Sequence, residues 1–208
     1  MLPTATGIRG TGAKQSARLR LAALQKSMLT CARCTALVRC RSRVVPGAGA
    51  VGAAVAFVGI APGRFGGDRT GVPFSGDRSG NLLRAMIAAA GLRRVFITNL
   101  VRCNPRDAQG RNRDPRPAEI ANCRRHLEAE LALVRPRIVA CLGRMAWLYI
   151  AGRSAPFDPV APAAVSAGRW MVYPMYHPAY VNRGAYPVEN YARDFNRLRL
   201  ALEETTVG

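Results

Sequence analysis

The chain has 208 residues, of which 49% are hydrophobic and 21% are charged, so it can bury the core of one ordinary domain without disulfides. No apolar stretch approaches the roughly 20 residues that cross a membrane, and the opening residues lack the apolar run of a secretory signal. These features exclude collagen, coiled coils, membrane spans and disulfide-stapled mini-proteins, and a soluble intracellular domain is the expectation that remains.

The charge is strongly positive. Thirty-one Lys and Arg residues face twelve Asp and Glu residues, a net charge of +19, and no acid occurs before Asp68. A GC-rich genome explains why only Lys14 and Lys26 are lysines, but it does not explain the surplus of charge. Such a surplus repels itself unless an anionic partner accepts it, and a nucleic-acid backbone is the usual one. A ribosomal or chromatin scaffold is the alternative that charge alone leaves open.

In chain order, residues 1–13 are rich in Gly and Thr and are expected to form a disordered, basic N-terminus, with a single domain over 14–208. Apolar residues at helical spacing predict a helix from Lys14 to Leu29, followed by a loop over 30–50. Strands and helices then alternate. The expected strands are 54–60, 95–98, 137–142 and 170–175, and the expected helices are 80–90 (capped by Ser79), 117–134, 143–151 and 188–203.

This alternation predicts a three-layer α/β/α sandwich with a central four-stranded parallel sheet, because wholly apolar strands need both faces covered. Ligands of such sheets bind at the carboxyl ends of the strands. The loops at those ends begin at Ala61, Asn99, Gly143 and Tyr176. We therefore expect the functional site there.

Six cysteines lie at positions 31, 34, 40, 103, 123 and 141. Cys31 and Cys34 have the spacing of a metal-binding pair, and Cys141 lies within an apolar strand, where a core role is expected. Zinc usually shows a second short-spaced pair, which this chain lacks, and scattered thiolates suit an iron–sulfur cluster. On spacing alone a cluster, zinc and plain structural cysteines all stay open, and Cys40 could replace a member of the first pair.

Three stretches, in order, resemble the iron–sulfur uracil-DNA glycosylases. Gly59–Gly63 followed by Gly66–Gly80 resembles the first motif of that family, and Val95–Cys103 resembles its second strand with a cluster cysteine. Tyr176–Tyr180 resembles its closing HPS-type motif. The match runs from Cys31 to about Leu202, so the resemblance implies one uracil-DNA glycosylase-like domain.

Two branches of this family share the resemblance. The fourth family carries an acid at the second position of the first motif, where this chain has Ile60. Gly66–Asp77 resembles the corresponding run of the fifth family, so the chain is placed nearer the fifth. Gly63 and the short ending His177-Pro178-Ala179-Tyr180 are closer to the fourth.

The resemblance implies a monofunctional glycosylase of base excision repair, which flips uracil and possibly other deaminated bases out of DNA and hydrolyses the N-glycosidic bond. It also implies a [4Fe–4S] cluster on Cys31, Cys34, Cys103 and Cys123. A bacterial-type cytoplasmic protein associated with the nucleoid is expected, acting as a monomer on DNA and not on membranes. The alternative is a catalytically weak or inactive iron–sulfur nucleic-acid-binding protein of the same fold.

Residues of the base site follow from the chemistry together with the resemblance. Phe74 is expected to stack on the flipped base, and Asn99 to pair with the O4/N3 edge of uracil. His177 is expected to donate to O2 of the leaving base. The first motif is expected to contact the base and its developing charge through Gly59, Ile60, Ala61, Pro62 and Gly63.

The remaining candidates concern water and DNA. Asp77 is expected to position the attacking water, with Asp68 as the other candidate, and the structural alternative for either is an acid that caps backbone amides or pairs with an arginine. Tyr180 and Arg183 are expected to press on the duplex. His126, the second histidine, is expected at the surface of a basic helix.

Overall fold

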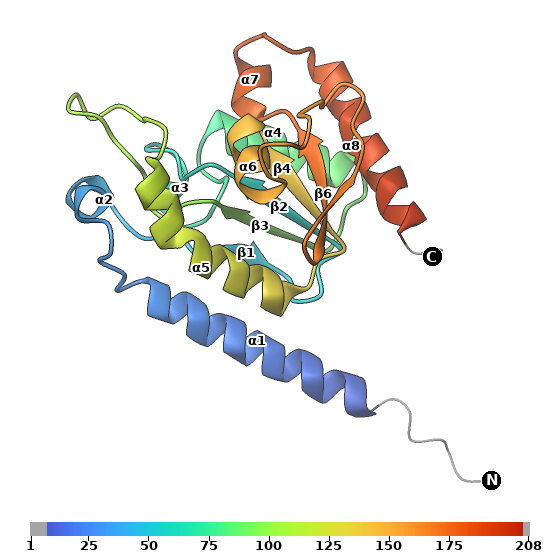
Figure 1. Cartoon of the computed structure of the whole chain (residues 1–208), viewed down its shortest axis with the longest axis horizontal. Helices are drawn as coiled ribbons and strands as arrows, with labels where there is room; N and C mark the ends of the chain where they lie inside the picture. Colours follow the sequence, from blue (N-terminus) through green and yellow to red (C-terminus); the bar gives the residue numbers. More distant parts are fainter. Residues whose placement is uncertain (1–7, 206–208) are drawn as a thin grey trace.

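A mixed sheet of six strands forms the centre of the computed structural model, which describes residues 8–205 and the side chains from residue 12 onward (Figure 1). Its order is β1-β3-β2-β4-β6-β5. The strands are β1 (Ala48–Gly49), β2 (Val55–Gly59), β3 (Val95–Asn99), β4 (Ile138–Leu142), β5 (Val165–Ala167) and β6 (Trp170–Met175).

The four expected strands are confirmed, and they are parallel to one another as β3-β2-β4-β6. The expectation of only four strands was wrong, because β1 pairs antiparallel with β3 and β5 pairs antiparallel with β6 at the two edges. These edge strands have two and three residues, too few to produce an alternating pattern in the sequence. β2 and β4 are buried along their whole length, as expected for strands covered on both faces.

Helices cover both faces of the sheet, so the three-layer α/β/α class is confirmed. On one face the core includes Met28, Leu131 and Trp147, and on the other it includes Leu83 and Phe195. The helices are α1 (Ile8–Met28), α2 (Thr35–Cys40), α3 (Gly67–Thr70), α4 (Arg78–Ala89), α5 (Pro117–Val134), α6 (Arg144–Ile150), α7 (Pro178–Asn182) and α8 (Val188–Glu204).

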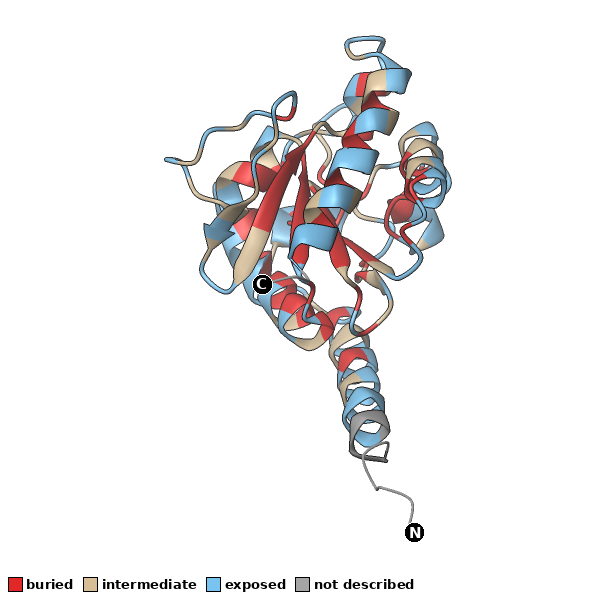
Figure 2. Cartoon of the chain, turned by 90° about the vertical axis from the view of Figure 1, so that its right-hand side faces the viewer, coloured by how far each residue is buried: buried red, intermediate tan, exposed pale blue. Residues whose placement is uncertain are grey.

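Two expectations about helix starts need correction. α1 begins at Ile8, so residues 8–13 are helical and not disordered, whereas residues 1–7 lie outside the described part of the chain. Residues 12–20 of α1 stand away from the body and are mostly exposed, whereas Leu21 and Met28 are buried nearer its end (Figure 2). α4 begins two residues earlier than expected, because Asp77 and not Ser79 caps it, accepting from Gly80 N at 2.8 Å.

None of the helices within residues 8–205 combines the length and apolar character that crossing a bilayer requires. The loops that follow β2, β3 and β6 carry the short helices α3 and α7 and gather at one edge of the sheet (Figure 1). This is the edge at which a ligand site was expected.

Candidate active site

A cavity of about 370 Å³ opens at the carboxyl ends of β2, β3 and β6. It brings together three segments that are far apart in the sequence, within 60–79, 99–114 and 177–183. The expected site residues that line it are Ile60, Ala61, Pro62, Gly63, Phe74, Asp77, Asn99, His177 and Arg183. The cavity thus lies at the edge of the sheet where the carboxyl-end rule predicts a ligand site.

Asn99 is the last residue of β3, and its side chain is buried with neither Oδ1 nor Nδ2 hydrogen-bonded to protein. Leaving both groups unpaired costs folding free energy unless a ligand or water satisfies them. Gly59 makes room for this arrangement, since a Cβ there would lie 2.6 Å from Asn99 Oδ1 and 2.6 Å from the Phe74 ring. The cavity thus offers one donor and one acceptor side by side on a single carboxamide.

Phe74 forms a buried wall of the cavity, next to His177 at 5.6 Å between ring centroids. Its φ is +50°, a left-handed conformation that costs about 1 kcal/mol or more for a residue with a Cβ. Arg84 stabilises this turn by donating from Nε to the Phe74 carbonyl at 2.8 Å and from Nη2 to that of Pro73 at 3.0 Å. The backbone that carries the ring is therefore held by Arg84, and the ring itself lines the cavity.

His177 caps α7, and its Nδ1 accepts a hydrogen bond from Ala179 N at 3.1 Å. A neutral imidazole in that arrangement carries its proton on Nε2. Burial, together with the smaller effect of the nearby positive charge of Arg183, lowers the pKa of His177 from 6.5 to about 4. At neutral pH His177 is thus an uncharged ring whose Nε2–H is available as a donor at the cavity.

The sequence left two interpretations of Asp77 open, an acid at the site and an acid that caps backbone amides, and its position is compatible with both. Its Oδ1 caps α4, whereas its Oδ2 faces the first motif, 2.0 Å from where a Cβ on Gly66 would lie and 3.1 Å from where one on Gly63 would lie. Gly66 is therefore required for the acid to sit this close to the loop. One carboxylate oxygen is fixed by the cap, and the residue still lines the cavity.

Asp68 is not among the residues that line the cavity. It is fully buried, accepts from Ser42 N at 3.0 and 3.1 Å, and pairs with Arg106. These contacts fasten the segment after α2 to the loop after β3. The structure therefore separates the two candidate acids, leaving Asp77 at the cavity.

The two candidate DNA contacts lie in different places. Arg183 is exposed and lines the cavity, whereas Tyr180 does not line it. The Tyr180 ring stacks on Tyr176 with 5.0 Å between centroids and 19° between planes. Arg183 is thus an exposed residue of the cavity, whereas Tyr180 and Tyr176 lie outside its lining.

The loop after β3 supplies cavity residues that the sequence reasoning missed. Asn104 Nδ2 donates to the carbonyl of Pro62 at 2.7 Å and to Asn112 Oδ1 at 2.8 Å, and it thereby holds the first motif in place. Arg113 also lines the cavity and pairs with Glu119 at 2.6 Å. Their position just after a strand end was the available signal. The sequence had selected only Asn99, at the end of the strand, and Cys103, within the loop.

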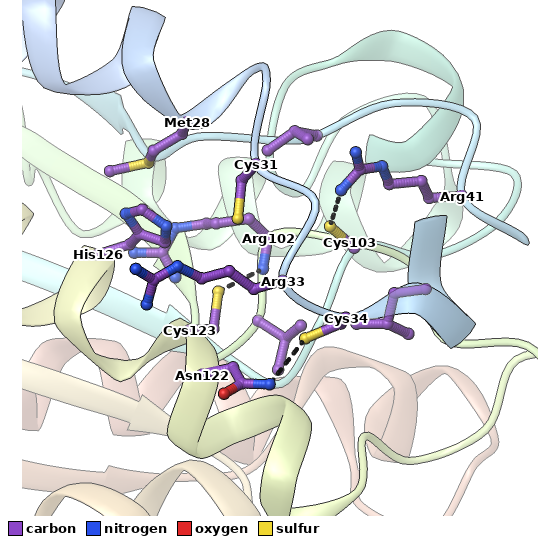
Figure 3. Close-up of a pocket in the computed structure, with 13 residues that line it drawn as sticks. Met28, Cys31, Arg33, Cys34, Arg41, Arg102, Cys103, Asn122, Cys123 and His126 are labelled. Carbon is purple, nitrogen blue, oxygen red and sulfur yellow. Dashed lines mark hydrogen bonds between the residues drawn. The ribbon is translucent and has the colours of Figure 1, made fainter. Parts of the chain in front are cut away.

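A second cavity contains the four cysteines expected to bind a cluster, Cys31, Cys34, Cys103 and Cys123 (Figure 3). Three of their sulfurs accept hydrogen bonds. Arg41 Nη1 donates to Cys103 at 3.1 Å, Arg102 N donates to Cys123 at 3.4 Å, and Asn122 Nδ2 donates to Cys34 at 3.5 Å. Donors of this kind stabilise sulfurs that carry negative charge, as metal-bound thiolates do.

The donor set fits a cluster better than a single ion. Within residues 8–205, no three His, Cys, Asp or Glu side chains converge as one metal ion requires. A [4Fe–4S] cluster is larger than a single ion, and each of its four irons takes one thiolate, so its four sulfurs surround it at a wider spacing. Burial raises the pKa of Cys103 to about 11 and also raises that of Cys123, so binding of a metal group must displace their protons.

The two cysteines not expected to bind a cluster, Cys40 and Cys141, and the second histidine, His126, occupy different environments. Cys40 does not line the cysteine cavity, and its Sγ donates to the Asn104 carbonyl at 3.4 Å. Cys141 is fully buried in β4, so its expected core role is confirmed. The expectation of a surface His126 was wrong, because the residue is buried at the cysteine cavity with Nε2 unpaired. Its spacing of three residues from Cys123 on α5 was the signal, since such residues share a helix face.

Comparisons with known proteins agree with this geometry. A family model described as the uracil DNA glycosylase superfamily matches residues 46–199. The chain is 36% identical over 183 residues to the type-4 uracil-DNA glycosylase of Archaeoglobus fulgidus, covering 83% of this chain and 88% of that protein. It is 35% identical over 205 residues to the type-5 uracil-DNA glycosylase of Pyrobaculum aerophilum, covering 82% and 88%. Both expected branches therefore match, at nearly equal identity.

Proposed function

Because the chain belongs to the uracil-DNA glycosylase superfamily, we propose that it excises uracil from DNA by hydrolysing the N-glycosidic bond and leaving an abasic site. One observation carries this proposal more than any other. The buried carboxamide of Asn99 has no protein partner and lies in a cavity walled by Phe74. The O4/N3 edge of uracil offers an acceptor for the Nδ2 group and a donor for the Oδ1 atom of this carboxamide.

Base recognition comes first. The target nucleotide must leave the duplex, which costs a few kcal/mol of stacking and pairing. Stacking on Phe74 offsets about 1–3 kcal/mol of that cost, and Asn99 pairs with the O4/N3 edge. Arg183, exposed at the mouth, holds a phosphate of the extruded strand.

Bond cleavage then places negative charge on the departing base. The Nε2–H of His177 donates to O2, and the backbone N–H groups of Ile60, Ala61 and Gly63 add further donors to the anion. Asp77 orients the attacking water with its Oδ2. Since the sugar is already cation-like when water arrives, this acid contributes less than the donors to the base.

The cysteine cavity supports a [4Fe–4S] cluster on Cys31, Cys34, Cys103 and Cys123. When bound, the group would supply a covalent connection between the segment before α2, the loop after β3 and α5. We propose no redox role for it in base hydrolysis. Arg33, Arg41 and Arg102 line this cavity and favour an anionic group there.

The net charge of +19 supports DNA as the partner, with several phosphate contacts along the molecule. We propose that the protein acts as a monomer on uracil-containing DNA in the bacterial cytoplasm, where it associates with the nucleoid. Other deaminated bases that present the same carbonyl and imide edge are within the proposed substrate range.

A single-turnover assay tests the function directly. A duplex with one uracil is incubated with enzyme in excess, and alkali then cleaves the abasic product. We expect strand cleavage at the uracil, none in the matched duplex with thymine, and at least a tenfold slower rate for Asn99→Ala. Tight DNA binding without cleavage would instead identify a non-catalytic binding protein and contradict the proposal.

A further inference from the structure

Arg102 is a fully buried arginine between the two sites. It lies three residues after the end of β3 and one residue before Cys103, and it lines the cysteine cavity (Figure 3). A buried guanidinium is costly unless it is paired and hydrogen-bonded. Its partners are therefore informative about its role.

Those partners belong to the cysteine cavity, to helix α5 and to the end of β3. The backbone N of Arg102 donates to Cys123 Sγ at 3.4 Å, and its Nη2 donates to Glu130 Oε2 at 2.6 Å. Its Nη1 donates to the backbone carbonyl of Asn99. One residue thus contacts the cysteine site, helix α5 and the residue proposed to recognise the base.

Glu130 makes this arrangement rigid. The carboxylate is fully buried on α5 and also accepts from Thr98 Oγ1 at 2.8 Å and from Gly47 N at 2.7 Å. Gly47 belongs to the segment that follows the first cysteine pair, whereas Thr98 precedes Asn99 on β3. The ion pair therefore connects both cysteine-bearing parts of the chain with the end of β3.

The side chain of Asn99 has no hydrogen bond of its own to protein. Its direction thus depends on its backbone, and the carbonyl of that backbone is held by Arg102. The next two amides extend the effect, because Leu100 N donates to Gly59 O at 2.8 Å and Val101 N donates to Ile60 O at 3.1 Å. Movement of residues 99–102 would displace both Asn99 and the first motif.

We propose that Arg102, with Glu130, is the positioning residue that sets Asn99 for base discrimination and transmits the order of the cysteine site to the base cavity. The inference rests on the proposed function for its catalytic readout. An ion pair that served stability alone could use both Nη groups on the carboxylate, as bidentate pairs do. Here one donor of the fork is directed to Asn99 instead.

Two variants separate positioning from folding. Arg102→Met with Glu130→Gln removes the charge pair together, which avoids an unpaired buried carboxylate, and the glutamine can still accept from Gly47 N. Arg102→Lys keeps the charge but loses the planar fork. Leu131→Ala is the matched control, since Leu131 is a buried neighbour on α5 that faces the core, and its truncation lowers stability without touching Asn99.

We expect the double variant to excise uracil at least tenfold more slowly in single turnover, and to lose at least tenfold in discrimination between uracil and cytosine. Arg102→Lys should fall between it and the wild type. Iron content should be unchanged in both, so that loss of the cluster does not explain the effect. Leu131→Ala, measured at a temperature equally far below its Tm, should keep the wild-type discrimination.

Hydrogen exchange gives a readout that does not depend on catalysis. Amides 100 and 101 should exchange at least tenfold faster in the double variant, and at the wild-type rate in Leu131→Ala. A folded, iron-replete double variant with wild-type discrimination and exchange would overturn the positioning role. Equal loss of discrimination in Leu131→Ala would also overturn it. An inactive wild type would instead reject the proposed function, while exchange at amides 100 and 101 would still decide whether Arg102 positions Asn99.

Discussion

The cavity lined by Asn99 and His177 (the base cavity) and the cysteine cavity both contain residues from the end of β3 or just after it. They differ in whether the polar atoms that line them are already hydrogen-bonded to protein. Asn99 and Cys103 are separated by only three residues. In the base cavity the carboxamide of Asn99 is left unpaired. In the cysteine cavity three of the four sulfurs already accept hydrogen bonds from Arg41, Arg102 and Asn122. Unpaired groups suit a ligand that comes and goes, whereas satisfied sulfurs suit a group that stays.

Charge separates the two cavities as well. The cysteine cavity is lined by three arginines, of which Arg102 is paired with Glu130. The base cavity has neutral His177, with the acids Asp77 and Asp114, exposed Arg183, and Arg113 paired with Glu119. A permanent anionic group can be met by fixed cations. A base that becomes anionic only as its bond breaks is better met by neutral donors, which do not stabilise other anions in the resting site.

The largest expected effect is loss of the cysteine site. Cys123→Ser should lower iron from about four atoms per chain to a small residue, and it should also lower Tm, because the connection between α5 and the amino-terminal segment is lost. Cys40→Ser and Cys141→Ala are matched controls, since neither residue lines the cavity, and both should keep their iron. Iron analysis and thermal unfolding measure this, and stoichiometric zinc in the wild type would reject the cluster.

Substitution of the two acids of the first motif, Asp68 and Asp77, should affect stability differently. Asp68→Asn breaks the buried pair with Arg106, so we expect a loss of about 3–5 kcal/mol in the free energy of unfolding, with little change in the rate of excision. Asp77→Asn should cost little stability, since asparagine also caps helices. Denaturant unfolding of both variants is the measurement. A strongly destabilised Asp77→Asn beside a stable Asp68→Asn would reverse the assignment.

Among residues of the base cavity, His177→Ala should slow excision by about 10²–10³, or about 2.7–4 kcal/mol, because the departing base loses a donor. Asp77→Asn should slow it by no more than that, since a cation-like sugar needs little help from a base. Single-turnover rates with enzyme in excess compare them without interference from product release. An inactive Asp77→Asn beside a nearly normal His177→Ala would show that water activation dominates.

The low pKa of His177 also predicts a pH dependence of stability. Unfolded, the ring takes up a proton near pH 6.5, whereas folded it resists until about 4, so the free energy of unfolding falls as pH drops through this window. The loss should reach about 2 kcal/mol by about pH 5. His177→Asn keeps a capping side chain and should remove this component. Identical pH profiles for the two proteins would show that the folded ring titrates normally.

The smallest effect concerns the mouth of the cavity. Arg183→Ala should weaken DNA binding by a similar factor for all sequences and reduce the log–log salt slope by about 0.9, the contribution of one phosphate contact. Arg199→Ala, on α8 and paired with Glu203, is the control and should leave the slope unchanged. Titrations at several salt concentrations provide the slopes. A change confined to uracil-containing DNA would place Arg183 on the base.

Local patterns in the sequence determined the strands and the main helices. The apolar runs around Phe57 and Val139 predicted buried parallel strands, and Pro117 marked the start of α5. The ordered motifs selected the four cysteines, Asn99 and His177, and the carboxyl-end rule brought the last two to one cavity. Each of these inferences needs only neighbouring residues or a general rule for parallel sheets, which is why they could be drawn without coordinates.

Tertiary structure alone decided which of several chemically similar residues does what. Asp68 and Asp77 occupy the same motif, and only the positions of Ser42 and Arg106, distant in sequence, make one of them structural. The burial of His126 and the pairing of Arg102 with Glu130 depend likewise on how α5 packs against β3. Such roles arise from contacts between segments far apart in the chain. A buried charge is tolerated only where those contacts satisfy it, and spacing along the sequence does not encode them.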